Sequence, residues 1–185
     1  MKKISEKEAK GLLKKYSVDK KGFDIVLEHV LAVKNVSLII AKEIKKRKHK
    51  VDLDLIKTGS LLHDIGRFKY PPWNKKMIRH GYWGGQILRK EGLLKEAKIA
   101  ERHLGAGISK EEIIKGKLHL PKKDFLPKTI EEKIIAYVDN MIFQDRLGKF
   151  TEVADKFKGL SLSVKKRLAQ LHNEIEKLRG GTQKF

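Results

Sequence analysis

Apolar residues recur along this chain at intervals of three and four positions, and no convincing run alternates between apolar and polar residues. Such a repeat is typical of amphipathic helices. Over residues 23–46, for example, the side chains of Val26, Val30, Val33 and Ile40 fall on one helical face. The pattern therefore predicts an all-α fold.

Capping and stop signals divide this pattern into separate helices. Ser5 with Glu8, and Ser109 with Glu112, have the spacing of a capping box, and Gly66 stands where a glycine would stop a helix. The predicted helices cover residues 5–15, 23–46, 54–64, 80–90, 94–103, a short stretch after 109, 130–147 and 163–179. Prolines predict a turn at 71–72 and a loop over 116–128, and the pattern is weakest over 148–162.

The length of 185 residues is near that of one domain and is enough to bury a core of several helices. No segment approaches the roughly 18 consecutive apolar residues of a membrane span, and the first residues are charged rather than apolar. We therefore expect a cytoplasmic protein with no signal peptide and no membrane association. The sequence does not fix the oligomeric state.

Composition limits the chemistry that the chain can perform. Cysteine is absent, so any metal ion must be held by nitrogen and oxygen atoms, and a thiol nucleophile is excluded. Lys and Arg number 43 against 23 Asp and Glu, which gives a formal net charge of +20. A surface this basic attracts polyanions such as nucleotides and nucleic acids. Heavy use of Lys and Glu is equally typical of proteins from hot organisms, where the charges form a solvated surface.

The adjacent pair His63-Asp64 closes an apolar helix, where an imidazole and a carboxylate are costly to bury. Neighbouring side chains on a helix point about 100° apart, so both reach one ion only near a helix end. Gly66 supplies such an end. A His-Asp pair alone is common by chance, and other inward-facing polar residues are needed to support a metal site.

Two further polar residues lie on apolar helical faces. His29 follows Val26 by three positions and precedes Val33 by four, which places it on the inward face of its helix. A core histidine without a ligand is the alternative interpretation. Asp139 lies within the apolar run 134–143, and a buried carboxylate costs several kcal/mol unless a positive group pairs with it. One shared cation would satisfy all of these residues, as in metal sites between facing helices.

His29, then His63-Asp64, then Asp139 resemble in order and approximate spacing the pattern of the HD-domain phosphohydrolase superfamily. The segment His63-Asp64-Ile65-Gly66 is that superfamily's HDIG variant, and the resemblance covers about residues 23–143. It implies a helical bundle around one or two divalent metals. It also implies hydrolysis of a phosphate ester or anhydride, commonly in a nucleotide, without fixing the substrate.

The resemblance also extends to the branches of the superfamily that hold two metals. His80 and His103 fall where those members place two more histidines, and His80 opens a segment similar to the family's His-x-x-x-Gly. The implied metal ligands are His29, His63, Asp64, His80, His103 and Asp139, with Asp64 bridging the two ions. The resemblance favours Mn or Fe, while nitrogen and carboxylate donors also suit Co, Ni and Zn.

Asp64 and Arg67 are the predicted catalytic residues. The family often has Lys directly after its His-Asp-x-Gly, whereas this chain has Arg67. Its planar fork suits bidentate contact with a phosphate, but it does not act as a proton donor at neutral pH. The remaining histidines, His49, His119 and His172, are expected at the surface without a role.

We expect residues 1–150 to form the metal-binding domain and residues 151–185 a basic C-terminal helix that is packed on it or appended to it. The expected partner is a phosphorylated small molecule or nucleotide, with nucleic acid as a further partner of the basic surface. One alternative function is nucleic-acid binding, supported by the charge and by Lys165, Lys166, Arg167 and Lys177. Another is a sensing module that binds metal and nucleotide without turnover.

Overall fold

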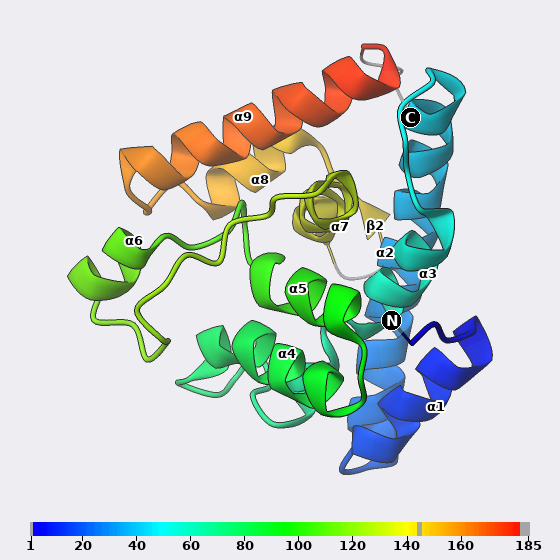
Figure 1. The fold of residues 1–185 in the computed structure, drawn as a ribbon. Helices are drawn as coiled ribbons and strands as arrows, with labels where there is room; N and C mark the ends of the chain where they lie inside the picture. The colour runs from blue at the N-terminus through cyan, green and yellow to red at the C-terminus, as the bar shows by residue number, and fades with distance from the viewer. Residues whose placement is uncertain (1, 144–145, 182–185) are drawn as a thin grey trace.

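The computed structural model describes residues 2–143 and 146–181, and over these residues the all-α prediction is confirmed (Figure 1). The helices are α1 (Glu6–Tyr16), α2 (Lys20–Lys46), α3 (Leu53–Leu62), α4 (His80–Lys90), α5 (Leu94–Arg102), α6 (Lys110–Lys115), α7 (Ile130–Met141), α8 (Phe150–Lys156) and α9 (Leu162–Arg179). Two short 3-10 turns, η1 (Ile65–Phe68) and η2 (Met77–Arg79), lie between α3 and α4, and the two-residue strands β1 (Ile142–Phe143) and β2 (Arg146–Leu147) follow α7.

Local capping fixes where several helices begin. The predicted capping boxes are confirmed, since Ser5 and Glu8 open α1 and Ser109 and Glu112 open α6. In each box the hydroxyl accepts from the backbone N–H three residues on, while the glutamate accepts from the backbone of the capping serine. These contacts involve residues close in sequence, and sequence patterns therefore identify them well.

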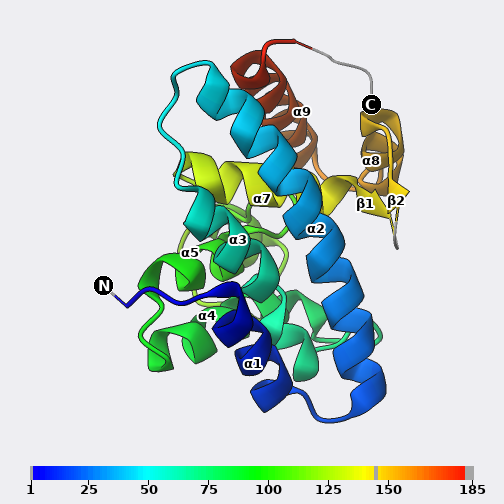
Figure 2. The ribbon, with the colours of Figure 1, turned by 90° about the vertical axis from the view of Figure 1, so that its right-hand side faces the viewer.

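The long helix α2 runs along the height of the molecule, with α1 against its lower end and α9 at its upper end (Figures 1 and 2). Helices α3 and α7 pack beside its middle, and α5 lies between α3, α4 and α7. The four residues predicted to face inward from α2, Val26, Val30, Val33 and Ile40, are all buried. α2 therefore acts as the common wall of the fold.

In the part of the chain that the structure describes, two apolar clusters form the core. One joins the later part of α2 with α7 and α9 through residues such as Ile44, Ile134 and Ile175. The other joins α1, the early part of α2, α3 and α4 through residues such as Leu13 and Leu61. Since α2 contributes to both clusters, its middle turns lie between them.

The predicted helix over 130–147 is wrong beyond Met141, and its residues 144–145 lie outside the described part. Ile142 and Phe143 are extended and pair antiparallel with Leu147 and Arg146. The N–H of Gly148 donates to the carbonyl of Met141 at 2.7 Å, which closes the hairpin and ends α7. This contact competes with the helical repeat, and the apolar pattern alone does not reveal it.

Helix α8 was not predicted, because two helical turns with one buried residue, Val153, give no apolar repeat to detect. Helix α9 packs on α7, α8 and α2 through Leu168, Leu171 and Ile175. At its end Arg179 donates to the carboxylate of Glu43 on α2 at 2.7 Å. The division of the chain at residue 150 stays a prediction, and residues 182–185 of that segment lie outside the described part.

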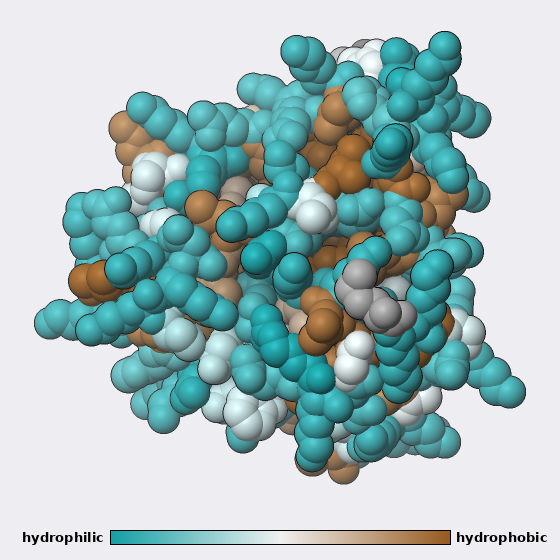
Figure 3. All heavy atoms as spheres, in the orientation of Figure 1, coloured by the Kyte–Doolittle hydropathy of each residue, from teal (hydrophilic) through white to brown (hydrophobic). Residues whose placement is uncertain are grey.

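Hydrophilic residues cover most of the face shown in Figure 3, with apolar residues in small patches among them. Across residues 2–143 and 146–181, none of the helices combines the length and the hydropathy that crossing a bilayer requires.

Candidate metal centre

The pair His63-Asp64 lies at the junction between α3 and η1. α3 ends at Leu62, and η1 begins directly after Asp64. The side chain of His63 is fully buried, and that of Asp64 is 7% exposed. Because the α-helical repeat stops here, the two side chains reach the same interior space, with Nε2 of His63 4.0 Å from Oδ2 of Asp64.

Gly66 allows a close backbone approach rather than stopping a helix with a left-handed cap. We predicted such a stop, but η1 continues through Gly66, and the backbone φ angle of Gly66 is not positive. A Cβ at this position would collide with the carbonyl oxygen of His80 and lie 2.8 Å from the backbone nitrogen of Gly84. The missing side chain therefore lets the start of α4 lie against η1 and brings His80 next to Asp64.

Oδ2 of Asp64 faces His29 and His63. The carboxylate of Asp139 faces the same two histidines. His29 on α2 donates from Nε2 to Oδ1 of Asp139 on α7 at 2.9 Å, and the same nitrogen lies 3.7 Å from Oδ2 of Asp64. Nε2 of His63 lies 3.4 Å from Oδ1 of Asp139. The structure thus joins residues that are 110 positions apart in the sequence.

Oδ1 of Asp64 faces the other two histidines. Nε2 of His80 at the start of α4 lies 3.0 Å from it, and Nε2 of His103, directly after α5, lies 3.4 Å from it. The two Nε2 atoms are 3.0 Å apart. All six predicted ligands therefore form one cluster with Asp64 at its middle.

Backbone carbonyls orient three of the imidazole rings. Nδ1 of His63, His80 and His103 lies 2.6, 2.6 and 2.8 Å from the carbonyl oxygen three residues earlier in the chain. A carbonyl only accepts, so each Nδ1 carries the proton, and in the neutral ring each Nε2 presents its lone pair to the cluster. Metal-binding histidines are commonly fixed in this way by a partner on the other nitrogen.

This arrangement leaves lone pairs without donors. Nε2 of His63 is buried and has no hydrogen-bond partner among the described residues, and the lone pairs of His80 and His103 face each other. Buried polar atoms without partners are rare and costly. A divalent cation would satisfy them together with the two carboxylates, and His29, His63 and Asp139, like His63, Asp64 and His103, present ligand atoms within 4.8 Å of one another. The residues present fit a metal ion.

The charges of the cluster suit the same role. Burial raises the pKa of Asp64, but Arg67, His80 and His63 outweigh it and hold the pKa well below its usual range. Burial also raises the pKa of Asp139, and contacts with His29 and His63 hold it well below its usual range. Burial lowers the pKa of His80. The carboxylates are therefore charged and His80 is neutral near pH 7, as coordination requires.

Arg67 lies at the edge of the cluster. Its Nε donates to both oxygens of Asp64, at 3.2 and 3.3 Å. Its Nη1 is buried and finds no hydrogen-bond partner within residues 2–143 and 146–181. The side chains of Arg67, His29 and Asp139 are 18, 26 and 18% exposed, whereas those of His63, His80 and His103 are at most 1% exposed. The cluster is therefore more open to solvent on the side of His29, Asp139 and Arg67.

Sequence reasoning missed the contacts that hold α5 in place. Nη1 of Arg102 donates to both carboxylate oxygens of Glu132 on α7, at 2.9 and 2.8 Å, and a Cβ on Gly81 would lie 2.7 Å from the carbonyl oxygen of Ala100. Both contacts lie next to His103. Thr129 and Glu132 have the spacing of a capping box, and this spacing could have identified Glu132 as a structural residue at the start of α7.

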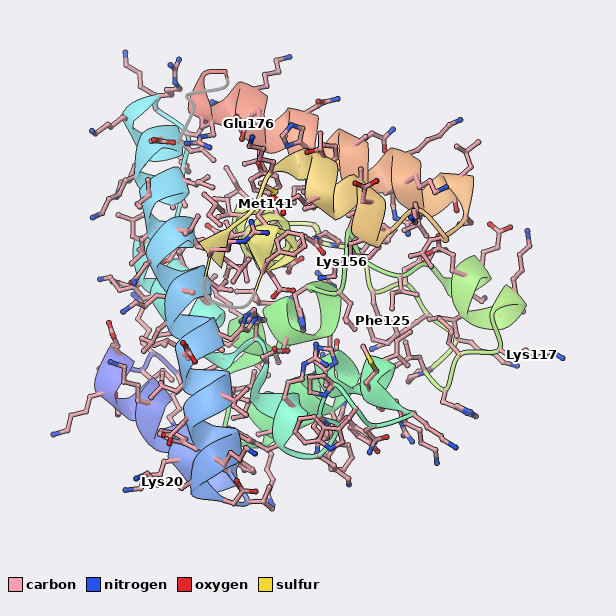
Figure 4. All side chains as sticks on the ribbon, turned by 180° about the vertical axis from the view of Figure 1, so that it is seen from behind. Lys20, Lys117, Phe125, Met141, Lys156 and Glu176 are labelled. Carbon is pink, nitrogen blue, oxygen red and sulfur yellow. The ribbon has the colours of Figure 1, made fainter. Side chains whose placement is uncertain are left out.

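The other histidines lie away from the cluster. His49 and His119 are exposed, as predicted. The surface prediction is wrong for His172, which is half-buried, stacks on Phe150 at 4.0 Å and lies 3.2 Å from the Tyr137 hydroxyl through Nδ1. Tyr137 also donates to Glu176, which lies on the inner side of α9 (Figure 4).

A hollow of about 660 Å³ lies at a different place, between the segment before α1 and the starts of α3 and α5. None of the six clustered residues lines it. Lys57 and Lys95 line it together with Asp52 and Asp54, so it offers charges of both signs. Its shape and charge give no reason to assign it to the metal centre.

A family model for the HD domain matches residues 26–142. The chain belongs to the HD domain family. The match spans every residue of the cluster, and the His and Asp groups of this HD domain are arranged so that they could hold a divalent metal. The family assignment supports a metal-dependent phosphohydrolase in general.

Several relatives resemble this HD domain over most of its length. The uncharacterized protein MJ0778 of Methanocaldococcus jannaschii is 45% identical over 157 residues, which cover 83% of this chain and 89% of that protein. The tRNA (cytidine(56)-2'-O)-methyltransferases of Thermoplasma volcanium and Picrophilus torridus are 37 and 38% identical over 91 and 85% of this chain. The matched regions are 46 and 43% of those two enzymes, so this chain spans less than half of their length.

A solved structure shares the fold. The HD domain of the L. monocytogenes phosphodiesterase PgpH, in complex with cyclic-di-AMP, aligns with a TM-score of 0.54 at 18% identity and covers 95% of this chain and 100% of that one. A second structure of the PgpH HD domain aligns with the same TM-score of 0.54, at 19% identity over 91% of this chain and 97% of that one. These likenesses show a shared HD-domain fold.

Proposed function

We propose that this HD domain hydrolyses phosphate esters of nucleotides at a metal centre built from His29, His63, Asp64, His80, His103 and Asp139. One observation carries the proposal: Asp64 is shared, with Oδ2 toward His29 and His63 and Oδ1 toward His80 and His103. A carboxylate between two groups of imidazoles is suited to bridge two ions. Resemblance to the HD superfamily favours Mn or Fe, and Co, Ni and Zn suit the same donors.

A divalent ion in such a centre supplies an activated water molecule and stabilises charge on phosphoryl oxygens. The chain itself supplies the framework. The Nδ1–H bonds to carbonyl oxygens hold His63, His80 and His103 in one orientation, and their burial keeps bulk water from that side. Preorganised ligands of this kind avoid rearrangement during the reaction.

Arg67 has a separate task in this proposal. Its Nε holds the carboxylate of Asp64 in place, while the guanidinium of this side chain, which is 18% exposed, has further donors for a phosphoryl oxygen. A guanidinium stays charged at neutral pH and does not release a proton, so Arg67 binds and orients a phosphate rather than protonating a leaving group.

The net positive charge of the chain and the names of its relatives both favour nucleotides as substrates. The formal charge of +20 attracts polyanions. The fold relative PgpH is named as a phosphodiesterase in complex with cyclic-di-AMP, and two sequence relatives are named as tRNA methyltransferases. The first name points to a cyclic dinucleotide and the second to tRNA, and both of these molecules contain phosphodiester bonds.

A second candidate function is binding without turnover, in which the centre holds metal and the chain senses a nucleotide or binds nucleic acid. The observation in its favour is the basic charge, which supports binding whether or not a bond is broken.

Hydrolysis assays separate the two candidates. Protein loaded with Mn²⁺ or Fe²⁺ would be incubated with bis-p-nitrophenyl phosphate, p-nitrophenyl phosphate, cyclic nucleotides and nucleoside triphosphates, with EDTA-treated protein as the control. We expect metal-dependent cleavage that the Asp64→Asn variant lacks. Tight metal binding and nucleotide binding without cleavage of any of these compounds would favour the sensing function.

A further inference from the structure

The stretch from Ile65 to Lys90 contains no Asp or Glu, although the chain has 23 of them. Within it, residues 67–83 form what we call the basic-aromatic segment. Its cations are Arg67, Lys69, Lys75, Lys76 and Arg79, and its aromatic residues are Phe68, Tyr70, Trp73, Tyr82 and Trp83, which include both tryptophans of the chain. Cations interleaved with aromatic rings are typical of surfaces that bind single-stranded nucleic acid.

The basic-aromatic segment is attached to the metal centre at two points. Near its start, Nε of Arg67 donates to Asp64. Later in the segment, the carbonyl of Met77 accepts from Nδ1 of His80 at 2.6 Å. The residues between these points therefore form a loop that leaves the centre and returns to it at the start of α4, which Figure 1 labels.

Trp73 lies on this loop in a structured turn. The N–H of Asn74 donates to the carbonyl of Pro71, and the N–H of Met77 donates to the carbonyl of Asn74, at 2.9 and 2.8 Å. Pro71 and Pro72 restrict the backbone further. The side chain of Trp73 is nevertheless 76% exposed. A large indole held outward by a structured turn leaves a stacking surface open to a partner.

Aromatic rings also hold two cations of the segment. Nζ of Lys69 lies 3.5 Å from the centroid of the Trp83 ring, and Cζ of Arg79 lies 5.4 Å from that of Tyr70. The rings of Tyr70 and Trp83 meet edge to face at 6.3 Å. Within the described residues neither cation has a carboxylate partner, and Nε of Arg79 is buried without a hydrogen bond. Their charge is therefore available to an anion.

We propose that the basic-aromatic segment binds single-stranded nucleic acid and leads it to the metal centre. A base stacks on Trp73, and the neighbouring phosphates contact Lys75, Lys76 and the ring-bound Lys69 and Arg79. Arg67 then meets the phosphate at the centre itself. This inference rests on the proposed function, which places cleavage at the metal centre. It specifies a nucleic-acid strand, rather than a free nucleotide, as the substrate.

An anionic lipid surface also attracts exposed tryptophan and lysine. The structure favours a strand, because membrane insertion needs a continuous apolar face. In this segment, only Trp73 and Met77 are exposed large apolar residues, and Lys75 and Lys76 lie between them. A nucleic-acid strand alternates bases with phosphates, so one base can stack on the Trp73 ring while neighbouring phosphates contact the lysines beside it.

Fluorescence tests the inference without any cleavage. The Trp83→Phe variant retains Trp73 as its one tryptophan, and it would be titrated in EDTA with an oligouridylate of about 10 nucleotides, a length within typical site sizes. We expect quenching of Trp73 on binding. In the otherwise unchanged chain, Trp73→Ala should weaken the affinity, measured by anisotropy of labelled oligonucleotide, by about 5- to 100-fold, the effect of one stacked base.

A charge-matched pair of variants controls for the basic surface as a whole. Lys75→Ala/Lys76→Ala and Lys165→Ala/Lys166→Ala each remove two exposed lysines, the second pair from α9. The first should weaken binding and lower the slope of log affinity against log salt by about 1 to 2, while the second should leave both nearly unchanged. Equal effects of the two pairs would overturn the inference.

The remaining outcomes separate this inference from the proposed function. Quenching by vesicles of anionic phospholipid but not by oligonucleotide would overturn it in favour of a membrane surface. Cleavage of free nucleotides by a chain that binds no oligonucleotide would overturn it while the proposed function stands. Binding through Trp73 with no cleavage of any phosphate ester would support the nucleic-acid site and contradict the proposed function.

Discussion

Nε2 of His80 and Nε2 of His103 lie 3.0 Å apart, and in both rings Nδ1 donates its proton to a backbone carbonyl. In their neutral forms, two lone pairs therefore point at each other in a buried place beside Asp64. Packing alone gives no reason for this arrangement, whereas a shared cation does.

Asp64→Asn should remove most metal retention and lower the rate of hydrolysis by more than about 100-fold, because even the outer partners of metal ligands contribute 10- to 100-fold. Asp64 has contacts to four imidazoles and to Arg67, and an amide carries no charge to balance them. Steady-state kinetics with added metal would measure the loss.

The matched control is Asp54→Asn, which changes the same chemistry at a side chain that is 80% exposed and pairs only with Lys57 among the described residues. It should retain activity and metal. An Asp64→Asn protein with the activity of the Asp54→Asn protein would contradict the metal centre.

Gly66→Ala should destabilise the fold by about 1–3 kcal/mol, because the added methyl group meets the backbone of His80 and Gly84 rather than a flexible side chain. The melting temperature should fall by roughly 2–4 °C per kcal/mol for a chain of this size. Gly159→Ala is the control, since a Cβ there would have no atom of another described residue within 4 Å. Equal melting temperatures of the two variants would contradict the close approach of η1 and α4.

Acidification should weaken the metal-free protein before its carboxylates are protonated. Burial lowers the pKa of His80 in the folded chain from its ordinary value of 6.5. Between the lowered value and 6.5, the unfolded chain binds a proton at this histidine and the folded chain does not, so stability is lost as the pH falls below 6.5. The pKa values of Asp64 and Asp139 are lowered, so their contribution persists to lower pH.

Urea unfolding of EDTA-treated protein at pH 7.5 and 5.5 measures this effect. The free energy of unfolding should be lower at pH 5.5, and His80→Gln should reduce the difference. A pH difference of the same size in the His80→Gln protein would contradict the lowered pKa of His80.

Much of the site could be predicted because helical periodicity fixes which residues face inward. His29 and Asp139 were identified from their positions on apolar faces, and the structure places them 2.9 Å apart. The position of α5 could not be predicted, because it depends on the Arg102–Glu132 ion pair and on the close approach at Gly81. Such contacts join residues far apart in sequence, and no local repeat records them.

The same limit applies to the fold. Capping boxes such as Ser5 with Glu8 act within one turn and were predicted correctly. The end of α7 depends on the bond from Gly148 to Met141, which forms only once the chain has reversed. The structured turn at Trp73 depends on Asn74 and on the approach of Met77 to His80, so the prolines alone predicted a turn but not an exposed indole.

The most direct measurement is the number of metal ions per chain, obtained by elemental analysis of protein purified without chelator. The shared position of Asp64 predicts about two transition-metal ions per chain, and about one in His103→Ala, which keeps His29, His63 and Asp139. The absence of bound metal in both proteins, even after reconstitution with Mn²⁺ and Fe²⁺, would contradict the metal centre.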